Sequence, residues 1–227
     1  MKGAVSVVRQ NTVPVPEYRF SADVVMLNEP TSLRSEAIRT LRTHVMARHF
    51  DTGRRGLTVC APSLGVGATF TAVNLAVSLA QVGLKVLLVD ADLRGGQVQN
   101  FVVPAEEPQG ILQLLSGPGQ VGDFVHSDVV AGLSVLFAGG VAANAQELLG
   151  ADKFSVEIGR CLRDYDLTIV DTPPANICAD VRRVSTLVGY SLLVARRHIT
   201  FVNDLKVLGA QLREDGTQII GSVLNEA

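Results

Sequence analysis

The stretch APSLGVGATF, residues 61–70, contains the residue types that could bind a polyphosphate. Gly65 and Gly67 lie between an apolar run and a helix-like run, where glycines let backbone N–H groups turn toward an anion. A helix that begins directly after them adds partial positive charge. The hydroxyl of Thr69 is in place to bind Mg²⁺. We therefore expect the contacts to ATP or ADP from Gly65, Val66, Gly67, Ala68, Thr69 and Phe70.

The segment meets the phosphate-loop pattern GxxxxGK[ST] only in part. Position 62 is Pro where the pattern has Gly, and position 68 is Ala where it has Lys. Taken alone, the two glycines fit a tight turn between a strand and a helix about as well as they fit a nucleotide site. The decision between these interpretations depends on the rest of the chain.

Three carboxylates follow apolar runs farther along the chain. LLVDADLR places Asp90 and Asp92 at the end of one expected strand, and LTIVDTPP places Asp171 at the end of another. A single Asp after a strand is usually a turn former. Three of them in a chain with a phosphate-type loop indicate catalytic carboxylates, with Mg²⁺ held by Thr69, Asp90 and Asp171.

The apolar pattern supplies the sheet that would bring these residues together. Strands are expected at 56–61, 85–90, 133–138, 167–171, 191–195 and 218–225, and helices near 69–83, 108–116, 145–164 and 200–214. Strands that are apolar at successive positions are buried on both faces. This predicts an α/β protein with the three-layer P-loop NTPase fold, a mainly parallel sheet flanked by helices. Ligands of such folds bind past the carboxyl ends of the strands.

The N-terminal part of the chain differs in pattern from the rest. Residues 1–30 contain three prolines and no helical period, which favours an extended arm. A helix is expected over 31–50, with Thr31 or Ser32 as its N-cap. We take 31–227 as one P-loop NTPase-like domain that includes this helix.

Composition excludes several classes of function. The chain has 20 basic and 22 acidic residues, a net charge of −2, which gives no bulk attraction to nucleic acid or to anionic lipid. No apolar run reaches the roughly 18 to 20 residues of a membrane span. The three cysteines lie in mostly apolar surroundings and indicate reduced thiols in a cytoplasmic protein. Any membrane association is therefore expected through a partner.

Six blocks in order resemble one family, the bacterial tyrosine kinases of capsule and exopolysaccharide synthesis within the MinD/ParA-like P-loop ATPases. They are PTSLRSEAIRTLRTHV, the stretch from APSLGVG to DADLR, AGGVAANAQELL, YDLTIVDTPPANICAD, GYSLLVARRHIT and IIGSVLN. The resemblance implies an ExxRxxR oligomerisation motif at Glu36, Arg39 and Arg42, and an adenine contact at Asn225. It also implies a partner, an inner-membrane, Wzz-like polysaccharide co-polymerase.

The sequence departs from that family in two places. Position 68 lacks the lysine that contacts the β- and γ-phosphates. The chain ends at SVLNEA with Tyr18, Tyr165 and Tyr190 and without the family's C-terminal tyrosine cluster. Substitution of the lysine by Arg54, Arg55 or Arg94 is one alternative, and an engineered lysine-to-alanine change is another. Both departures favour a degenerate kinase that binds nucleotide weakly.

The leading interpretation is a cytoplasmic, self-associating regulator of a co-polymerase in exopolysaccharide, capsule or holdfast-type polysaccharide synthesis. It would be peripheral to the inner membrane through that partner and would have little or no kinase activity. The alternative is an active ATP-dependent tyrosine kinase or ATPase of the same pathway. A MinD- or ParA-like positioning ATPase is a third possibility, although the lysine early in that group's loop and a C-terminal amphipathic helix are both missing.

Overall fold

A seven-stranded sheet forms the centre of the protein, which a computed structural model describes over residues 17–226. The strand order is β5-β6-β3-β7-β2-β8-β9, and every pair is parallel except β5 with β6. The strands are β2 (Gly56–Cys60), β3 (Val86–Asp90), β5 (His126–Val130), β6 (Leu133–Leu136), β7 (Leu167–Asp171), β8 (Tyr190–Arg196) and β9 (Gln218–Asn225). The predicted three-layer P-loop NTPase fold is confirmed.

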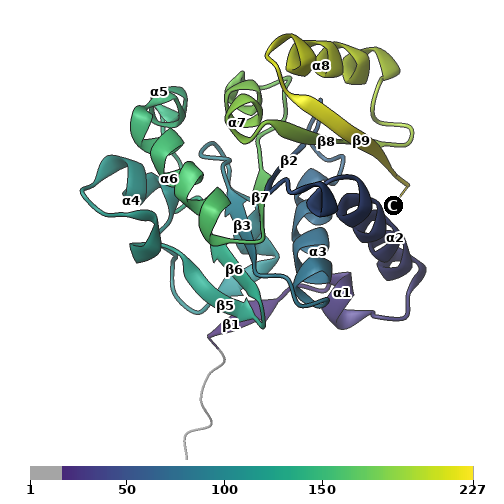
Figure 1. Ribbon diagram of the computed structural model, residues 1–227, viewed down its shortest axis with the longest axis horizontal. Helices are drawn as coiled ribbons and strands as arrows, with labels where there is room; N and C mark the ends of the chain where they lie inside the picture. The colour runs from purple at the N-terminus through teal and green to yellow at the C-terminus, as the bar shows by residue number, and fades with distance from the viewer. Residues whose placement is uncertain (1–16, 227) are drawn as a thin grey trace, which may run out of the picture.

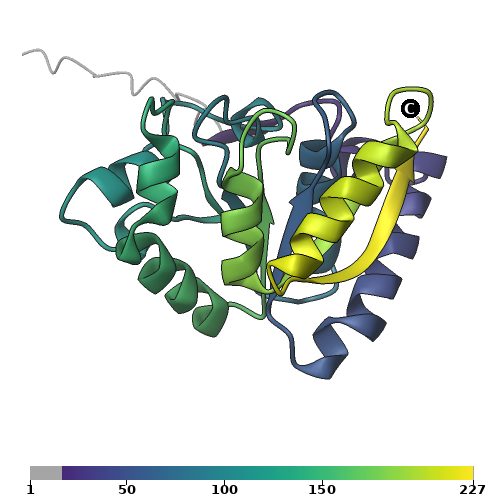
Figure 2. The ribbon, with the colours of Figure 1, turned by 90° about the horizontal axis from the view of Figure 1, so that it is seen from above.

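Helices cover both faces of the sheet (Figures 1 and 2). Along β3, Val86 and Leu88 pack toward one face, while Leu87 and Val89 pack toward the other. This alternation explains the unbroken apolar run, because each side of the strand meets a different helical layer. The first face carries α1 (Val25–Asn28), α2 (Leu33–Arg48) and α3 (Ala68–Ala80). The second carries α4 (Ile111–Ser116), α5 (Ala145–Gly150), α6 (Asp152–Asp164), α7 (Asp180–Val188) and α8 (Val202–Glu214).

The helix expected over 31–50 is α2, whose N-cap is one of the two residues named from the sequence. The Ser32 side chain accepts a hydrogen bond from the Ser35 N–H and so satisfies a donor that the first turn leaves open. A short 3₁₀ turn, Phe50–Thr52, follows α2, and Gly53 ends it at a φ of +80°. The left-handed conformation at Gly53 favours glycine and turns the chain into β2.

The segment before α2 differs from the extended arm expected over 1–30. Residues 1–16 lie outside the described residues, but Tyr18–Phe20 forms β1, which pairs antiparallel with β4 (Val102–Pro104). The following α1 contacts α3, and its residues Val25 and Met26 are buried. The buried Asn74 of α3 donates to the Asp23 carbonyl and accepts from the Met26 N–H. The apolar run at 24–26 therefore packs into the core.

Two helical regions differ from the sequence expectation. The helix expected over 145–164 is divided into α5 and α6, because Ala151 is extended at a φ of −72° and a ψ of 150°. The chain also forms α7, a helix that was not expected from the sequence. Short 3₁₀ turns occur at Val98–Asn100 and Val121–Asp123. Within residues 17–226, no helix has the length and apolar character needed to cross a membrane.

Candidate nucleotide-binding site

The loop between β2 and α3 is shaped to receive an anion. Gly65 and Gly67 have φ values of +73° and +90°, a conformation that residues with a Cβ rarely adopt. Gly67 is the N-cap of α3, and no side chain caps this helix end. Within the described chain, the N–H groups of Gly65, Val66 and Gly67 find no acceptor. The loop therefore offers unsatisfied donors and the positive end of a helix at one place.

A cavity of about 440 Å³ opens beside this loop. It is lined by the whole set of nucleotide-binding residues predicted from the sequence, together with Asp92, and by further residues from α2, from β8 and from the segment that follows β7. Its lining includes Arg34, Gly65, Val66, Gly67, Ala68, Thr69, Phe70, Asp92, Thr172, Arg196 and Asn225. The structure thus brings the loop, the end of the last strand and one of the three predicted carboxylates to a single hollow.

Asp90 and Asp171 are buried and do not line this hollow. They are directly paired residues of the adjacent parallel strands β3 and β7, and each is 1% exposed. Asp171 Oδ2 accepts a 2.7 Å hydrogen bond from the Thr69 hydroxyl. Asp171 Oδ1 is buried and has no partner among the described residues. The strand pairing therefore places two carboxylates next to the first turn of α3.

Asp90 and Asp92 are held by backbone donors. Asp90 accepts from the N–H groups of Asp92 and Val98, at 3.1 and 3.0 Å. Asp92 accepts from the N–H groups of Arg94 and Gly95, at 2.9 and 3.1 Å. These bonds fix the turn after β3 and aim Asp92 at the cavity that it lines. Asp90 and Asp92 thus have different surroundings although they are two residues apart.

Burial disfavours the charged form of these carboxylates. It raises the pKa of Asp90 to about 7 against the opposing hydrogen bonds from Val98 and Asp92. Burial, and next the charge of Asp90, raise the pKa of Asp171 well above its usual range. The pKa of Asp92 is also raised, chiefly by burial. A bound cation would reverse this effect by stabilising the carboxylates in their charged form.

The residues at this site fit Mg²⁺ shared with phosphates and waters better than they fit a metal ion whose ligands all come from the protein. The described residues contain no group of three or more His, Cys, Asp or Glu side chains placed to hold a metal ion. Mg²⁺ usually keeps several waters and is held by one or two carboxylates together with substrate phosphates. The unpartnered oxygen of Asp171 and the hydroxyl of Thr69 match that need. Bound there, Mg²⁺ would neutralise phosphate charge.

Position 68 has no lysine, and the three arginines considered as substitutes from the sequence are occupied elsewhere. Arg94 pairs with Asp180 at 2.8 Å, and Arg54 stacks over the Tyr190 ring at 4.7 Å. Arg55 donates to the Tyr165 carbonyl. None of the three lines the cavity.

Two other arginines, which the sequence analysis did not name, line the cavity instead. Arg34 stacks over the Phe70 ring at 4.9 Å and pairs with Asp23 at 3.2 Å. Arg196 donates a 2.9 Å hydrogen bond to the Gly65 carbonyl. The sequence signal for Arg196 was its place at the end of an expected strand, the same signal that identified the carboxylates.

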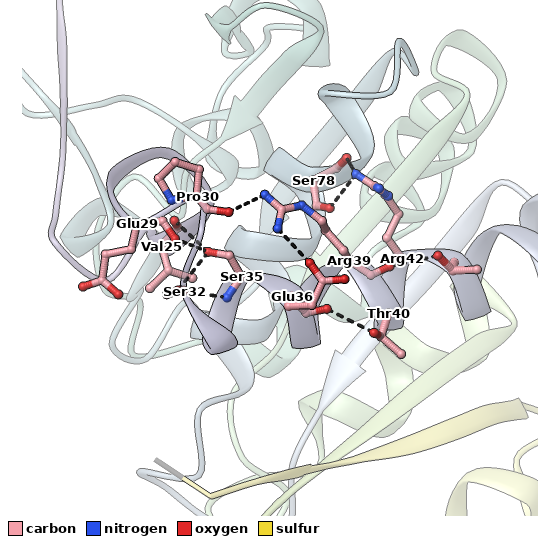
Figure 3. A network of polar contacts seen from close by, with 11 residues as sticks. Val25, Glu29, Pro30, Ser32, Ser35, Glu36, Arg39, Thr40, Arg42 and Ser78 are labelled. Carbon is pink, nitrogen blue, oxygen red and sulfur yellow. Dashed lines mark hydrogen bonds and ion pairs between the residues drawn. The ribbon is translucent and has the colours of Figure 1, made fainter.

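The predicted oligomerisation motif divides into two environments on α2 (Figure 3). Glu36 and Arg39 form an ion pair of 3.0 Å near the surface, and Arg39 also donates to the Pro30 carbonyl. Arg42 instead turns inward and donates to the carbonyl and hydroxyl oxygens of Ser78 on α3, at 3.0 and 3.2 Å. Arg42 therefore joins two helices of one chain, whereas Glu36 remains exposed.

Comparisons with known proteins point to one family. The AAA domain family matches residues 58–186, more than half of the chain. Tyrosine-protein kinase wzc of Salmonella typhi is 29% identical over 93% of this chain. Tyrosine-protein kinase etk of Escherichia coli K12 is 32% identical over 88% of it. The chain spans less than a third of the length of these two relatives, 29% and 27%.

A solved structure of a bacterial tyrosine kinase domain has the same fold as this chain. The kinase domain of Escherichia coli tyrosine kinase ETK superimposes with a TM-score of 0.84 at 31% identity, over 90% of this chain and 80% of that domain. The chain belongs to the AAA-domain P-loop proteins and, among them, to the bacterial tyrosine kinase family.

Proposed function

We propose that this domain binds ADP or ATP with Mg²⁺ and acts as a kinase-like regulator with weak or no phosphoryl transfer. One observation carries the proposal: Thr69, Asp171 and the glycine turns keep the arrangement of a phosphate site, while position 68 lacks the cation. Gly65, Val66, Gly67, Ala68, Thr69, Phe70 and Asn225 are the proposed nucleotide contacts. Thr69, Asp90 and Asp171 are the proposed magnesium groups, with Asp92 as a further carboxylate at the cavity.

The missing ammonium affects binding less than catalysis. Loss of one charge-assisted contact costs on the order of 1.5–3 kcal/mol, roughly a 10- to 100-fold weaker affinity. The cost in the transition state is larger, because the charge that develops there is what the site must stabilise. A loop with unsatisfied N–H donors retains part of the binding energy. Weak nucleotide binding without efficient phosphoryl transfer is the expected balance.

The proposed context is polysaccharide assembly at a membrane. The relatives wzc and etk are tyrosine-protein kinases of which this chain spans less than a third. We infer that the domain docks on an inner-membrane polysaccharide co-polymerase, is peripheral to that membrane from the cytoplasmic side and self-associates through the α2 face that carries Glu36 and Arg39. The exposed position of Glu36 supports this use of α2. Arg42 contributes indirectly by fixing α2 on α3.

The test combines titration and turnover. Isothermal titration with Mg-ADP and Mg-ATP should give weak but saturable binding, and a phosphotransfer assay with labelled ATP should give little product. The Ala68→Lys variant measured in parallel should bind more tightly. Rapid autophosphorylation on tyrosine by the unchanged protein would refute the regulatory part, and absence of nucleotide binding by both proteins would refute the site.

An active kinase or ATPase is the second candidate. The observation in its favour is the three carboxylates: Asp90 and Asp171 end the paired strands β3 and β7, Asp92 follows β3, and Asp171 accepts a hydrogen bond from Thr69. The ATP turnover of the unchanged protein separates the two candidates. A turnover that increases by orders of magnitude in Ala68→Lys favours the regulator, and a substantial turnover before the change favours the enzyme.

A further inference from the structure

The loop at 61–67 is held from outside by side chains of the last two strands. Arg196, at the end of β8, donates from Nη1 to the Gly65 carbonyl at 2.9 Å. Asn225, at the end of β9, donates from Nδ2 to the Val66 carbonyl at 3.1 Å. Arg196 and Asn225 are directly paired residues of these parallel strands. Two consecutive loop carbonyls are therefore bound by two neighbouring side chains.

Gly67, the next loop residue, lies close to the side chain of Asn225, which together with Arg196 forms what we call the loop anchor. A Cβ on Gly67 would collide with the side-chain amide nitrogen of Asn225, and the φ of +90° at Gly67 disfavours other residues as well. Glycine at position 67 thus allows the close approach of Asn225 to the loop. This contact and the two hydrogen bonds cover Gly65, Val66 and Gly67 in sequence.

The hydrogen bonds from Arg196 and Asn225 also determine where the N–H groups of the loop point. A peptide unit presents its C=O and the following N–H in opposite directions, so a carbonyl fixed toward β8 and β9 directs the next N–H away from these strands. The bonds at Gly65 and Val66 thereby set the directions of the N–H groups of Val66 and Gly67. These N–H groups find no acceptor within the described residues, and both residues line the cavity.

We propose that Arg196 and Asn225 are positioning residues of the phosphate-binding loop. Together they hold its carbonyls outward, so that its N–H groups are preorganised for the phosphates of a nucleotide in a site without the lysine at position 68. This inference rests on the proposed nucleotide site. It assigns Asn225 a second role, in shaping the loop, beside its proposed adenine contact.

The chain offers a matched control for Arg196. Arg197 is the next residue and is exposed; its side chain pairs with Glu226 at 3.4 Å and makes no hydrogen bond to the loop within the described residues. Arg197→Ala removes the same charge and side-chain length as Arg196→Ala without touching Gly65. Arg196→Lys keeps a donor and the charge, and therefore tests whether a conservative donor rescues the loop.

The experiment has two readouts that do not depend on each other. Backbone ¹⁵N order parameters of Gly65 and Gly67 in nucleotide-free protein report loop order, and titration with Mg-ADP reports affinity. We expect lower order parameters and about tenfold weaker binding in Arg196→Ala and in Asn225→Ala, with Arg197→Ala unchanged and Arg196→Lys close to the unchanged protein. The double variant should lose less than the product of the two single effects, because both act on one loop.

The outcomes separate the inference from the function on which it rests. Loss of loop order in Arg196→Ala and Asn225→Ala, in a protein that binds no Mg-ADP, supports the anchor and refutes the nucleotide site. Unchanged order parameters in both variants overturn the anchor, even where affinity falls, because Arg196 would then act by direct contact with the ligand. Equal effects of Arg196→Ala and Arg197→Ala also overturn it, since general charge would then be the cause.

Discussion

The hydroxyl of Thr69 donates a 2.7 Å hydrogen bond to Oδ2 of Asp171, while Oδ1 of the same carboxylate is buried without a partner in the described part of the chain. This contact joins the first turn of α3 to the end of β7. One oxygen is satisfied and the other is available, so the charge on Asp171 requires a proton or a cation nearby. Magnesium and pH should therefore both act on this residue.

Asp171→Asn should separate metal binding from stability. The variant removes a buried, incompletely paired charge, and we expect metal-free protein at pH 8 to gain about 1–3 kcal/mol in free energy of unfolding. It should also lose the Mg²⁺ dependence of nucleotide binding. Urea unfolding and titration with and without Mg²⁺ measure the two effects. Asp164→Asn, at an exposed position on α6, is the control and should change neither.

The pH dependence of stability should have an unusual sign for a carboxylate. Burial raises the pKa of Asp90 to about 7, whereas an unfolded Asp titrates near about 3.9. The folded state therefore binds the proton more tightly, and the stability gained from that proton is lost as pH rises from about 4 to about 7. The raised pKa of Asp171 adds to the same loss.

A comparison with the double variant Asp90→Asn/Asp171→Asn isolates this effect from the other titrating groups of the protein. The unfolding free energy of metal-free protein, minus that of the double variant, should fall between pH 5 and pH 8. Saturating Mg²⁺ with ADP should reduce the fall, since a cation stabilises the charged form. A difference that rises with pH over this range would contradict the assigned pKa directions.

Ala68→Lys should restore the charge that the loop lacks. The new ammonium would extend from the first residue of α3 into the cavity that Ala68 lines. We expect a roughly 10- to 100-fold tighter Kd for Mg-ATP. Ala68→Met adds comparable length without charge and should give no such gain. An equal gain in both variants would assign the effect to apolar packing.

Arg42→Ala should lower stability, in contrast to Glu36→Ala. Arg42 donates two hydrogen bonds to Ser78, so its loss should cost about 1–2 kcal/mol in free energy of unfolding. Glu36 makes one surface ion pair, worth less than about 1 kcal/mol. Urea unfolding and sedimentation of both variants measure stability and self-association. Loss of self-association in Glu36→Ala at unchanged stability would support the oligomerisation role, and its retention would count against it.

The sequence could predict the strands that are buried on both faces. The apolar runs that form β2, β3 and β7 have no polar face to turn to solvent, so they fit only a strand buried between two helical layers. β5 was missed because it is an edge strand with partly exposed residues and a positive φ at Asp128. Helix α7 was missed although Val181, Val184 and Val188 recur at helical spacing, because nine residues are a short window for that pattern.

Part of the candidate site could also be predicted from the sequence, and part could not. The positions of the glycine turn and of the carboxylates were predictable because each lies at the end of a strand or just after it, and these strand ends lie at one edge of the sheet. The direct pairing of Asp90 with Asp171 was not, since it depends on β7 lying between β3 and β2. The inward turn of Arg42 and the contact of Arg196 with Gly65 also depend on helix and strand packing that no local pattern encodes.

The amide of Asn74, bound on one side by the Asp23 carbonyl and on the other by the Met26 N–H, fixes where the folding unit begins. A polypeptide shortened to start at residue 31 would lose two of this amide's three hydrogen bonds, uncover the part of α3 that α1 packs against, and strip β4 of its strand partner. Such a fragment should unfold at lower temperature than one starting at residue 17. We therefore predict that recombinant work on this domain needs a start near residue 17 and not at residue 31, the boundary that proline content suggests.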